Sequence, residues 1–123
     1  MYRADQKTRE LLYSLGITEK YAGFFYTAAA AHLAACRPER LALITKWLYP
    51  DVAKQFRTDW RNVERGIRAA AKIAWELRPD KLAEIAKRDL NCRPTNSQFI
   101  TLLVSCVHPP ADDDLAYNLP LAS

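Results

Sequence analysis

Two helical patterns joined by a polar turn lie between positions 49 and 75 and constrain the fold more than any other stretch. Pro50 or Asp51 opens a short first helix, because proline suits the first helical position and an acid suits the positive helix end. The turn consists of Arg57, Thr58 and Asp59, and Thr58 or Asp59 can cap the second helix. The pattern predicts a helix-turn-helix, although glycine is more common than arginine in such a turn.

The second helix of this pair has an apolar face and a basic face. Its apolar residues recur at helical spacing and should be buried: Val63, Ile67, Ala70 or Ala71, and Ala74. Its basic residues recur at i, i+4, i+7 and i+11: Arg61, Arg65, Arg68 and Lys72. In the first helix, Val52, Ala53 and Phe56 share one face, and Ala53 is small where the two helices must cross closely.

The basic face allows two interpretations. It is either a solvated surface with intrahelical ion pairs, such as Glu64 with Arg68, or a surface for DNA. The preceding short helix and capped turn favour DNA, because a helix in the major groove needs arginines for phosphates and guanine edges. Arg37, Arg40 and Lys46 precede the motif closely and either touch the phosphate backbone or are plain surface charge.

Composition favours a single all-α domain. The chain has 123 residues, abundant alanine and three glycines, and no long run of alternating β-branched and polar residues. Its net charge is +4, and leaving out the stretch from Pro109, with Asp112, Asp113 and Asp114 and no basic residue, raises it to +7. A basic body suits a polyanion, although mild basicity is also common in proteins that bind none. We expect a domain over 1–108 and a disordered acidic tail over 109–123.

Further helices are predicted over 7–15, 21–36, 39–48, 81–90 and about 97–107. Thr95, Asn96 or Ser97 caps the last of them, with Gln98 close behind. Gly23 either lets another backbone approach or loosens the first turn of its helix. The expected core comprises Leu11, Leu12, Leu15, Ile17, Phe24, Phe25, Ala28, Ala31, Leu33, Leu41, Ile44, Leu48, Leu82, Ile85, Ala86, Phe99, Leu102, Leu103 and Cys106, with Leu43 and Trp47 beside it.

The sequence offers no enzymatic, metal or membrane site. Cys36, Cys92 and Cys106 are odd in number and widely spaced, which indicates reduced, buried or half-buried thiols in a cytoplasmic protein and argues against zinc. There is no glycine-rich phosphate loop, paired histidine or serine with a base partner, so we expect no catalytic residue and no cofactor. No signal peptide or membrane span is visible.

Three segments carry a family resemblance: Ile44–Phe56, Asn62–Arg68 continuing through Ala74–Trp75, and Arg93–Ile100, with a weaker echo at Leu15–Ile17 and Tyr21–Phe24. In these the chain resembles the C-terminal DNA-binding effector domain of the master sporulation response regulator of endospore-forming bacteria, over about Arg9 to Val107. The resemblance implies a compact six-helix fold that recognises a TGTCGAA-like element in double-stranded DNA.

The resemblance also implies roles for individual residues. Base contacts fall to Glu64 and Arg65, and to position 62, where Asn62 replaces a family arginine and would sooner pair with adenine than with guanine. The resemblance places flanking or backbone contacts at Arg68 and at the loop residues Arg93, Thr95, Asn96 and Ser97, and the basic face of the helix adds Arg61 and Lys72. The DNA element is therefore expected to differ at one position, or the affinity to be lower.

The family regulator also carries an N-terminal phosphoacceptor domain. If this chain is full-length, constitutive binding, or control by a partner or by concentration, is expected. The resemblance further suggests pairing of two copies on tandem sites through the last helix. The alternative function is an interaction module that kept the fold and modulates a family regulator without specific DNA reading.

Overall fold

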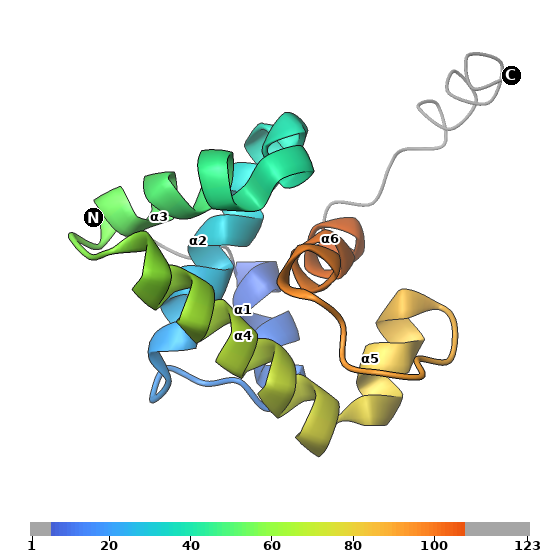
Figure 1. The fold of residues 1–123 in the computed structure, drawn as a ribbon. Helices are drawn as coiled ribbons and strands as arrows, with labels where there is room; N and C mark the ends of the chain where they lie inside the picture. The colour runs from blue at the N-terminus through green and yellow to red at the C-terminus, as the bar shows by residue number, and fades with distance from the viewer. Residues whose placement is uncertain (1–5, 108–123) are drawn as a thin grey trace, which may run out of the picture.

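The computed structural model describes residues 6–107, and this part of the chain is entirely helical (Figure 1). It contains six α-helices, one 3₁₀ helix and one π-helix, and no strand. In chain order these are α1 (Gln6–Ser14), α2 (Ala22–Cys36), η1 (Pro38–Leu43), η2 (Ile44–Leu48), α3 (Tyr49–Gln55), α4 (Trp60–Leu77), α5 (Pro79–Ala86) and α6 (Asn96–Val107). The predicted all-α fold is confirmed, whereas the predicted acidic tail lies outside the described residues.

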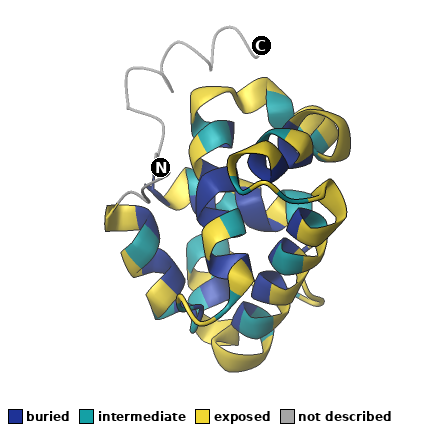
Figure 2. Cartoon of the chain, turned by 90° about the vertical axis from the view of Figure 1, so that its left-hand side faces the viewer, coloured by how far each residue is buried: buried dark blue, intermediate teal, exposed yellow. Residues whose placement is uncertain are grey.

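Helix α2 is the centre of the domain. It packs against α1, α3, α4 and α6 and against η1 and η2, and a helix surrounded in this way is apolar nearly all round. Its buried residues are Gly23, Phe24, Thr27, Ala28, Ala29, Ala30, Ala31 and Ala34. Figure 2 shows buried residues on the inward faces of the surrounding helices. The predicted face was wrong at Phe25, which is 40% exposed and packs edge-on against Phe24.

Most of the predicted core is confirmed, with corrections in the C-terminal third. Leu11, Leu12, Leu15, Ile17, Leu82, Phe99 and Leu103 are buried, and Leu33, Ile85, Ala86 and Leu102 are partly buried. The predicted helix 81–90 instead ends at Ala86, because Lys87 adopts a left-handed conformation with φ 60°. In α6, Cys106 is exposed, and Ile100 and Val107 are buried instead.

The predicted α-helix over 39–48 is wrong. Leu43, with φ −141° and ψ 76°, lies outside the helical region and separates η1 from η2. The interruption leaves Leu43 and Trp47 more than half exposed and Leu41 and Ile44 partly buried, while Leu48 is fully buried. Two short adjacent helices of different types, η1 and η2, thus replace one amphipathic α-helix.

Two other predictions concern the cysteines and the membrane. All three cysteines are free, but all are exposed, so the predicted burial is wrong. Cys36 and Cys106 lie in the last turns of α2 and α6, and Cys92 lies in the loop before α6. Within residues 6–107, no helix combines the length and the hydropathy that a bilayer crossing requires.

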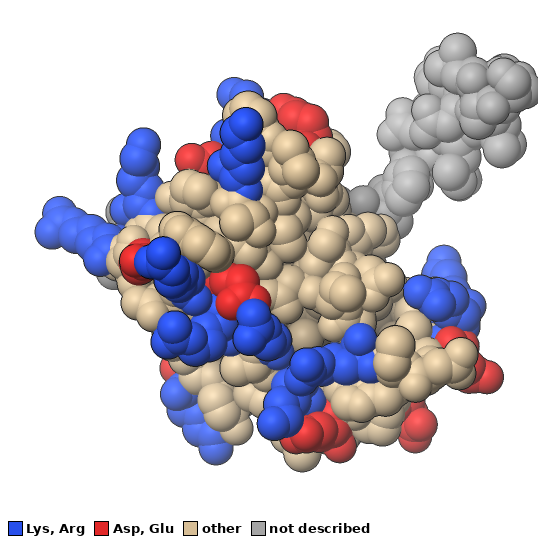
Figure 3. Space-filling view, in the orientation of Figure 1, with Lys and Arg blue, Asp and Glu red and all other residues tan. Residues whose placement is uncertain are grey.

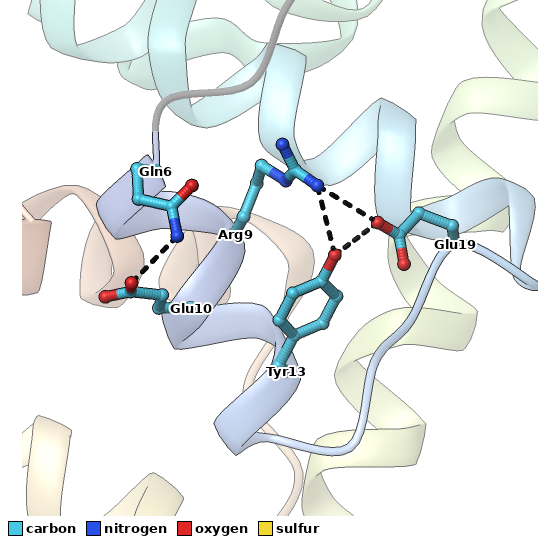
Figure 4. Close-up of polar contacts among 5 residues, drawn as sticks. All are labelled: Gln6, Arg9, Glu10, Tyr13 and Glu19. Carbon is cyan, nitrogen blue, oxygen red and sulfur yellow. Dashed lines mark hydrogen bonds and ion pairs between the residues drawn. The ribbon is translucent and has the colours of Figure 1, made fainter.

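A network of exposed polar side chains joins α1 to the loop that leads into α2 (Figure 4). The Tyr13 hydroxyl donates to the Glu19 carboxylate, and the Arg9 guanidinium lies 3.4 Å from the Tyr13 hydroxyl oxygen and 3.5 Å from Glu19. The hydrogen bond from Tyr13, helped by Arg9, lowers the pKa of Glu19. Tyr13 also stacks on Phe24, with ring centroids 5.7 Å apart, so the network fixes the approach to α2.

Helices α2 and α4 meet backbone to backbone at two glycines. A Cβ built on Gly23 would lie 2.2 Å from the carbonyl oxygen of Gly66, and one built on Gly66 would lie 2.6 Å from the Tyr26 ring. A side chain at Gly23 would meet the backbone of α4, and one at Gly66 would have to displace the Tyr26 ring. Of the two interpretations of Gly23, the structure therefore supports the close approach of another backbone. This contact places the start of α2 directly beside α4.

Replacing Gly23 with alanine should lower the free energy of unfolding by about 1–3 kcal/mol through this clash. Without the clash, the same change in a helix would stabilise the protein by about 0.5–1 kcal/mol, so the sign of the effect is diagnostic. Urea unfolding followed by circular dichroism measures it. Ala22→Ser, which adds one atom at the exposed neighbouring position, serves as the control and should change stability by less than about 0.5 kcal/mol. A more stable Gly23→Ala variant would contradict the close contact.

Candidate nucleic-acid interface

Helices α3 and α4 and the residues between them form an arrangement consistent with the predicted helix-turn-helix. Arg57 adopts a left-handed conformation with φ 53°, which explains why glycine is common at this point of the motif. Of the two predicted caps, Asp59 precedes α4 and its carboxylate accepts from the Arg61 backbone N–H at 2.7 Å. The Thr58 backbone N–H donates to the Ala53 carbonyl at 2.9 Å and closes the turn.

The two faces of α4 are those that the sequence predicts. The buried residues are Val63, Ile67, Ala70, Ala71 and Ala74, so both alternatives at 70 and 71 are inward. The four basic residues Arg61, Arg65, Arg68 and Lys72 are all exposed. Figure 3 shows lysine and arginine side chains gathered along the face that α4 presents in Figure 1. A buried face thus holds the helix, and a basic face points to solvent.

The exposed face of α4 has a ridge with a groove on each side. At about 100° a residue, Arg61, Arg65 and Lys72 lie opposite the centre of the buried face and form this ridge. Glu64 and Arg68 fall on one flank and line a groove with Thr45, Tyr49 and residues 93–97. Asn62, Gly66 and Ala69 fall on the other flank and, together with Arg65, line a groove with residues 20–23 and Tyr26.

The predicted base-contacting residues occupy different parts of this surface. Arg65 lies on the ridge, and no ion pair joins it to a carboxylate within residues 6–107. Glu64 lies on one flank with its side chain 24% exposed, and its carboxylate forms an ion pair with Arg68. Asn62 lies on the opposite flank, where its amide donates to the Thr58 hydroxyl at 2.9 Å. The structure therefore does not bring Asn62 and Glu64 side by side.

Glu64 and Asn62, on the two flanks of α4, each retain hydrogen-bonding positions that could contact a base. A carboxylate has about four acceptor sites, so pairing with Arg68 leaves Glu64 able to accept from a further donor. The bond to Thr58 uses one N–H of the Asn62 amide and leaves its second N–H and its oxygen. A bidentate contact to adenine requires one of each. The intrahelical pair Glu64–Arg68 also matches the solvated-surface interpretation, so the two interpretations overlap at this residue pair.

The loop before α6 contributes the other predicted residues. Thr95 is the helix cap: its backbone N–H donates to the Gln98 side chain at 2.9 Å, and its hydroxyl accepts from the Gln98 backbone N–H at 3.2 Å. Arg93 is exposed and Ser97 is half-buried. Arg93, Thr95 and Ser97 all line the groove beside Glu64 and Arg68, so this loop and α4 form one continuous surface.

Asn96 has a structural role that the sequence did not reveal. Its amide nitrogen donates to the Tyr49 hydroxyl at 2.9 Å and to the Glu64 backbone carbonyl at 3.0 Å. Both N–H groups are therefore used inside the protein, and they tie the start of α6 to α3 and α4. Burial raises the pKa of the Tyr49 phenol, although the hydrogen bond from Asn96 opposes this effect. The partners lie 47 and 32 residues away in sequence, so no local pattern signals them.

Comparison with known families agrees with this architecture. The family model described as the sporulation initiation factor Spo0A C terminal matches residues 8–107, which run from α1 to the end of α6. The chain therefore belongs to this family. The family is one of DNA-binding effector-type domains of a sporulation regulator, not a family of enzymes.

Replacing Asn96 with alanine should lower the free energy of unfolding by about 1–3 kcal/mol, because the hydroxyl of the buried Tyr49 and the Glu64 carbonyl lose a donor. Thermal or urea unfolding measures the change. Asn91→Ala removes an equivalent side chain at an exposed loop position and should change stability by less than about 0.5 kcal/mol. If Asn96→Ala is as stable as the wild type, the clamp between α6 and α4 does not operate.

Proposed function

We propose that this member of the Spo0A C-terminal family is a sequence-specific DNA-binding regulator of transcription, with α4 placed in the major groove. The observation that carries the proposal is the exposed basic ridge of α4, backed by a fully buried face and preceded by a capped turn. The major groove of B-DNA is about 12 Å wide and admits an α-helix of about 10–12 Å diameter. An α-helix presented in this way suits major-groove recognition.

The three base-contacting roles follow from side-chain chemistry. Arg65, on the ridge and free of carboxylates, forks onto the two acceptors of guanine. Glu64 accepts from the amino group of cytosine while Arg68 holds its other oxygen. Asn62 donates to and accepts from adenine, so the element should contain an A·T pair where the family arginine selects G·C.

The remaining predicted contacts go to the sugar-phosphate backbone. Arg61, Arg68 and Lys72 supply positive charge along α4, and Arg93, Thr95 and Ser97 supply a cation and hydroxyls at the neighbouring loop. Asn96 acts as a positioning residue, because both of its N–H groups bond within the protein. Pairing of two copies on tandem elements and a cytoplasmic location remain predictions.

One observation favours the alternative function of an interaction module. Glu64 and Asn62 both have partners within the protein, Arg68 and Thr58, and such pairs need no DNA. A module of this kind would bind duplexes with equal affinity whatever their sequence, because only the electrostatic attraction of phosphates would remain. Sequence preference therefore separates the two functions.

Arg65→Ala should cost about 1–3 kcal/mol of binding free energy on the preferred duplex and relax the preference at one base pair. Competition binding with duplexes that carry every single-base change of a TGTCGAA-like element measures both effects. Arg88→Ala, at an exposed position after α5, removes the same charge away from α4 and should leave the preference unchanged. Uniform weakening of all duplexes by Arg65→Ala would exclude its base-reading role.

Asn62→Arg should transfer the preference at its base pair from A·T to G·C, because arginine suits the two acceptors of guanine and asparagine suits adenine. The same set of duplexes measures the exchange. Asn62→Ala is the matched control, since it should lose the preference without acquiring a new one. If both variants retain the wild-type preference, Asn62 makes no base contact.

A further inference from the structure

A second groove flanks α4 on the side away from the loop 93–97. One wall consists of the residues that lead into and begin α2: Lys20, Tyr21, Ala22, Gly23 and Tyr26. The other wall consists of the α4 residues Asn62, Arg65, Gly66 and Ala69. No acidic residue lines this groove. The start of α2 therefore lies beside two of the proposed base-contacting residues.

The wall formed by α2 carries an unpaired positive charge. Within the described part of the chain, no ion pair joins Lys20 to a carboxylate. Its ammonium lies 5.2 Å from the centroid of the Tyr21 ring instead, an arrangement that holds a cation without neutralising it. The half-buried Tyr21 carries a phenol that can donate to an anion.

The neighbouring acid does not cancel this charge. Glu19 precedes Lys20, but its carboxylate accepts from the Tyr13 hydroxyl and pairs with Arg9 of α1 (Figure 4). Tyr13 and Arg9 together lower the pKa of Glu19, and both partners of its carboxylate lie on α1. The network therefore leaves Lys20 as the charged group on the α2 side of the groove, across from Arg65 of α4.

We propose that Lys20, with Tyr21, forms a second phosphate-binding edge that contacts the DNA strand opposite to the one held by the loop 93–97. This inference rests on the proposed function, because it requires α4 to lie in the major groove. Phosphates of the two strands line the two edges of that groove. A protein wall on each flank of α4 thus meets a different strand, Lys20 on one and Arg93 on the other.

The close contact between α2 and α4 makes this second edge possible. Because Gly23 and Gly66 lack side chains, the backbone of α2 comes within contact distance of α4. Larger residues at either position would move the start of α2 and its lysine away from the recognition helix. The same glycines that hold α4 therefore set the distance between Lys20 and the ridge.

The first test is the salt dependence of binding to a duplex. Lys20→Ala should reduce the magnitude of the slope of log K against log salt by about 0.9, the loss of one phosphate contact. It should weaken binding by a similar factor on preferred and altered duplexes. Lys20→Arg should keep the wild-type slope. Lys7→Ala is the matched control, because Lys7 is exposed on α1 and lines neither groove beside α4. The salt slope of this variant should match that of the wild type.

The second test assigns the strands. Ethylation of individual phosphates interferes with binding wherever the protein contacts them. Lys20→Ala should abolish interference at a phosphate on one strand, and Arg93→Ala should abolish it at a phosphate on the other. Both residues are exposed, and unfolding curves check that the variants remain folded.

The outcomes separate the two proposals. An unchanged slope and unchanged interference for Lys20→Ala, with the wild type still preferring a sequence, would overturn the second edge alone. Effects of Lys20 and Arg93 on the same strand would also overturn it. A wild type without sequence preference would overturn the proposed function, and a wild type that binds no duplex would overturn both.

Discussion

The position of α4 depends on a backbone contact between two glycines. Gly23 and Gly66 bring α2 and α4 so close that a Cβ at either position would clash. On the opposite flank, the Asn96 amide ties the Glu64 carbonyl to the start of α6. Between these two attachments, five buried residues hold the inner face of α4 against the core. The exposed ridge is therefore fixed relative to a wall on each side, and binding requires little ordering of the backbone.

Positive charge and hydrogen-bonding side chains would contribute differently to DNA binding at this surface. Positive charge on α4 attracts any duplex, because phosphates are the same in every sequence. Preference for one sequence requires groups that match base edges, and the structure offers them at three positions of differing accessibility. Arg65 stands on the ridge, whereas Glu64 and Asn62 lie on the flanks with partners of their own. Those intramolecular bonds orient the two side chains, so the proposed base contacts would require exchange or sharing of these bonds.

The short helix α3, the turn and the two faces of α4 were predictable from sequence because their signals are local: a cap at Asp59, an apolar period and a basic period along α4. The segment 39–48 was not, since its apolar spacing is helical while the backbone at Leu43 is not. Cys106 and Phe25 were wrongly predicted to be buried, because periodicity does not reveal which face of a helix its neighbours cover. The hydrogen bonds of Asn96 and the groove that Lys20 lines with α4 involve residues distant in sequence, which no local pattern encodes. The family resemblance supplied the candidate base contacts, whose roles binding experiments must test.

Selection from a random duplex pool with the wild-type protein, at two salt concentrations, tests whether α4 reads bases. We expect one enriched motif at both salt concentrations, related to TGTCGAA and carrying an A·T pair at the position assigned to Asn62. Higher salt should lower the yield without changing the motif, because base contacts persist when phosphate contacts weaken. Recovery of DNA without any shared motif, with binding that salt abolishes, would exclude base reading by α4.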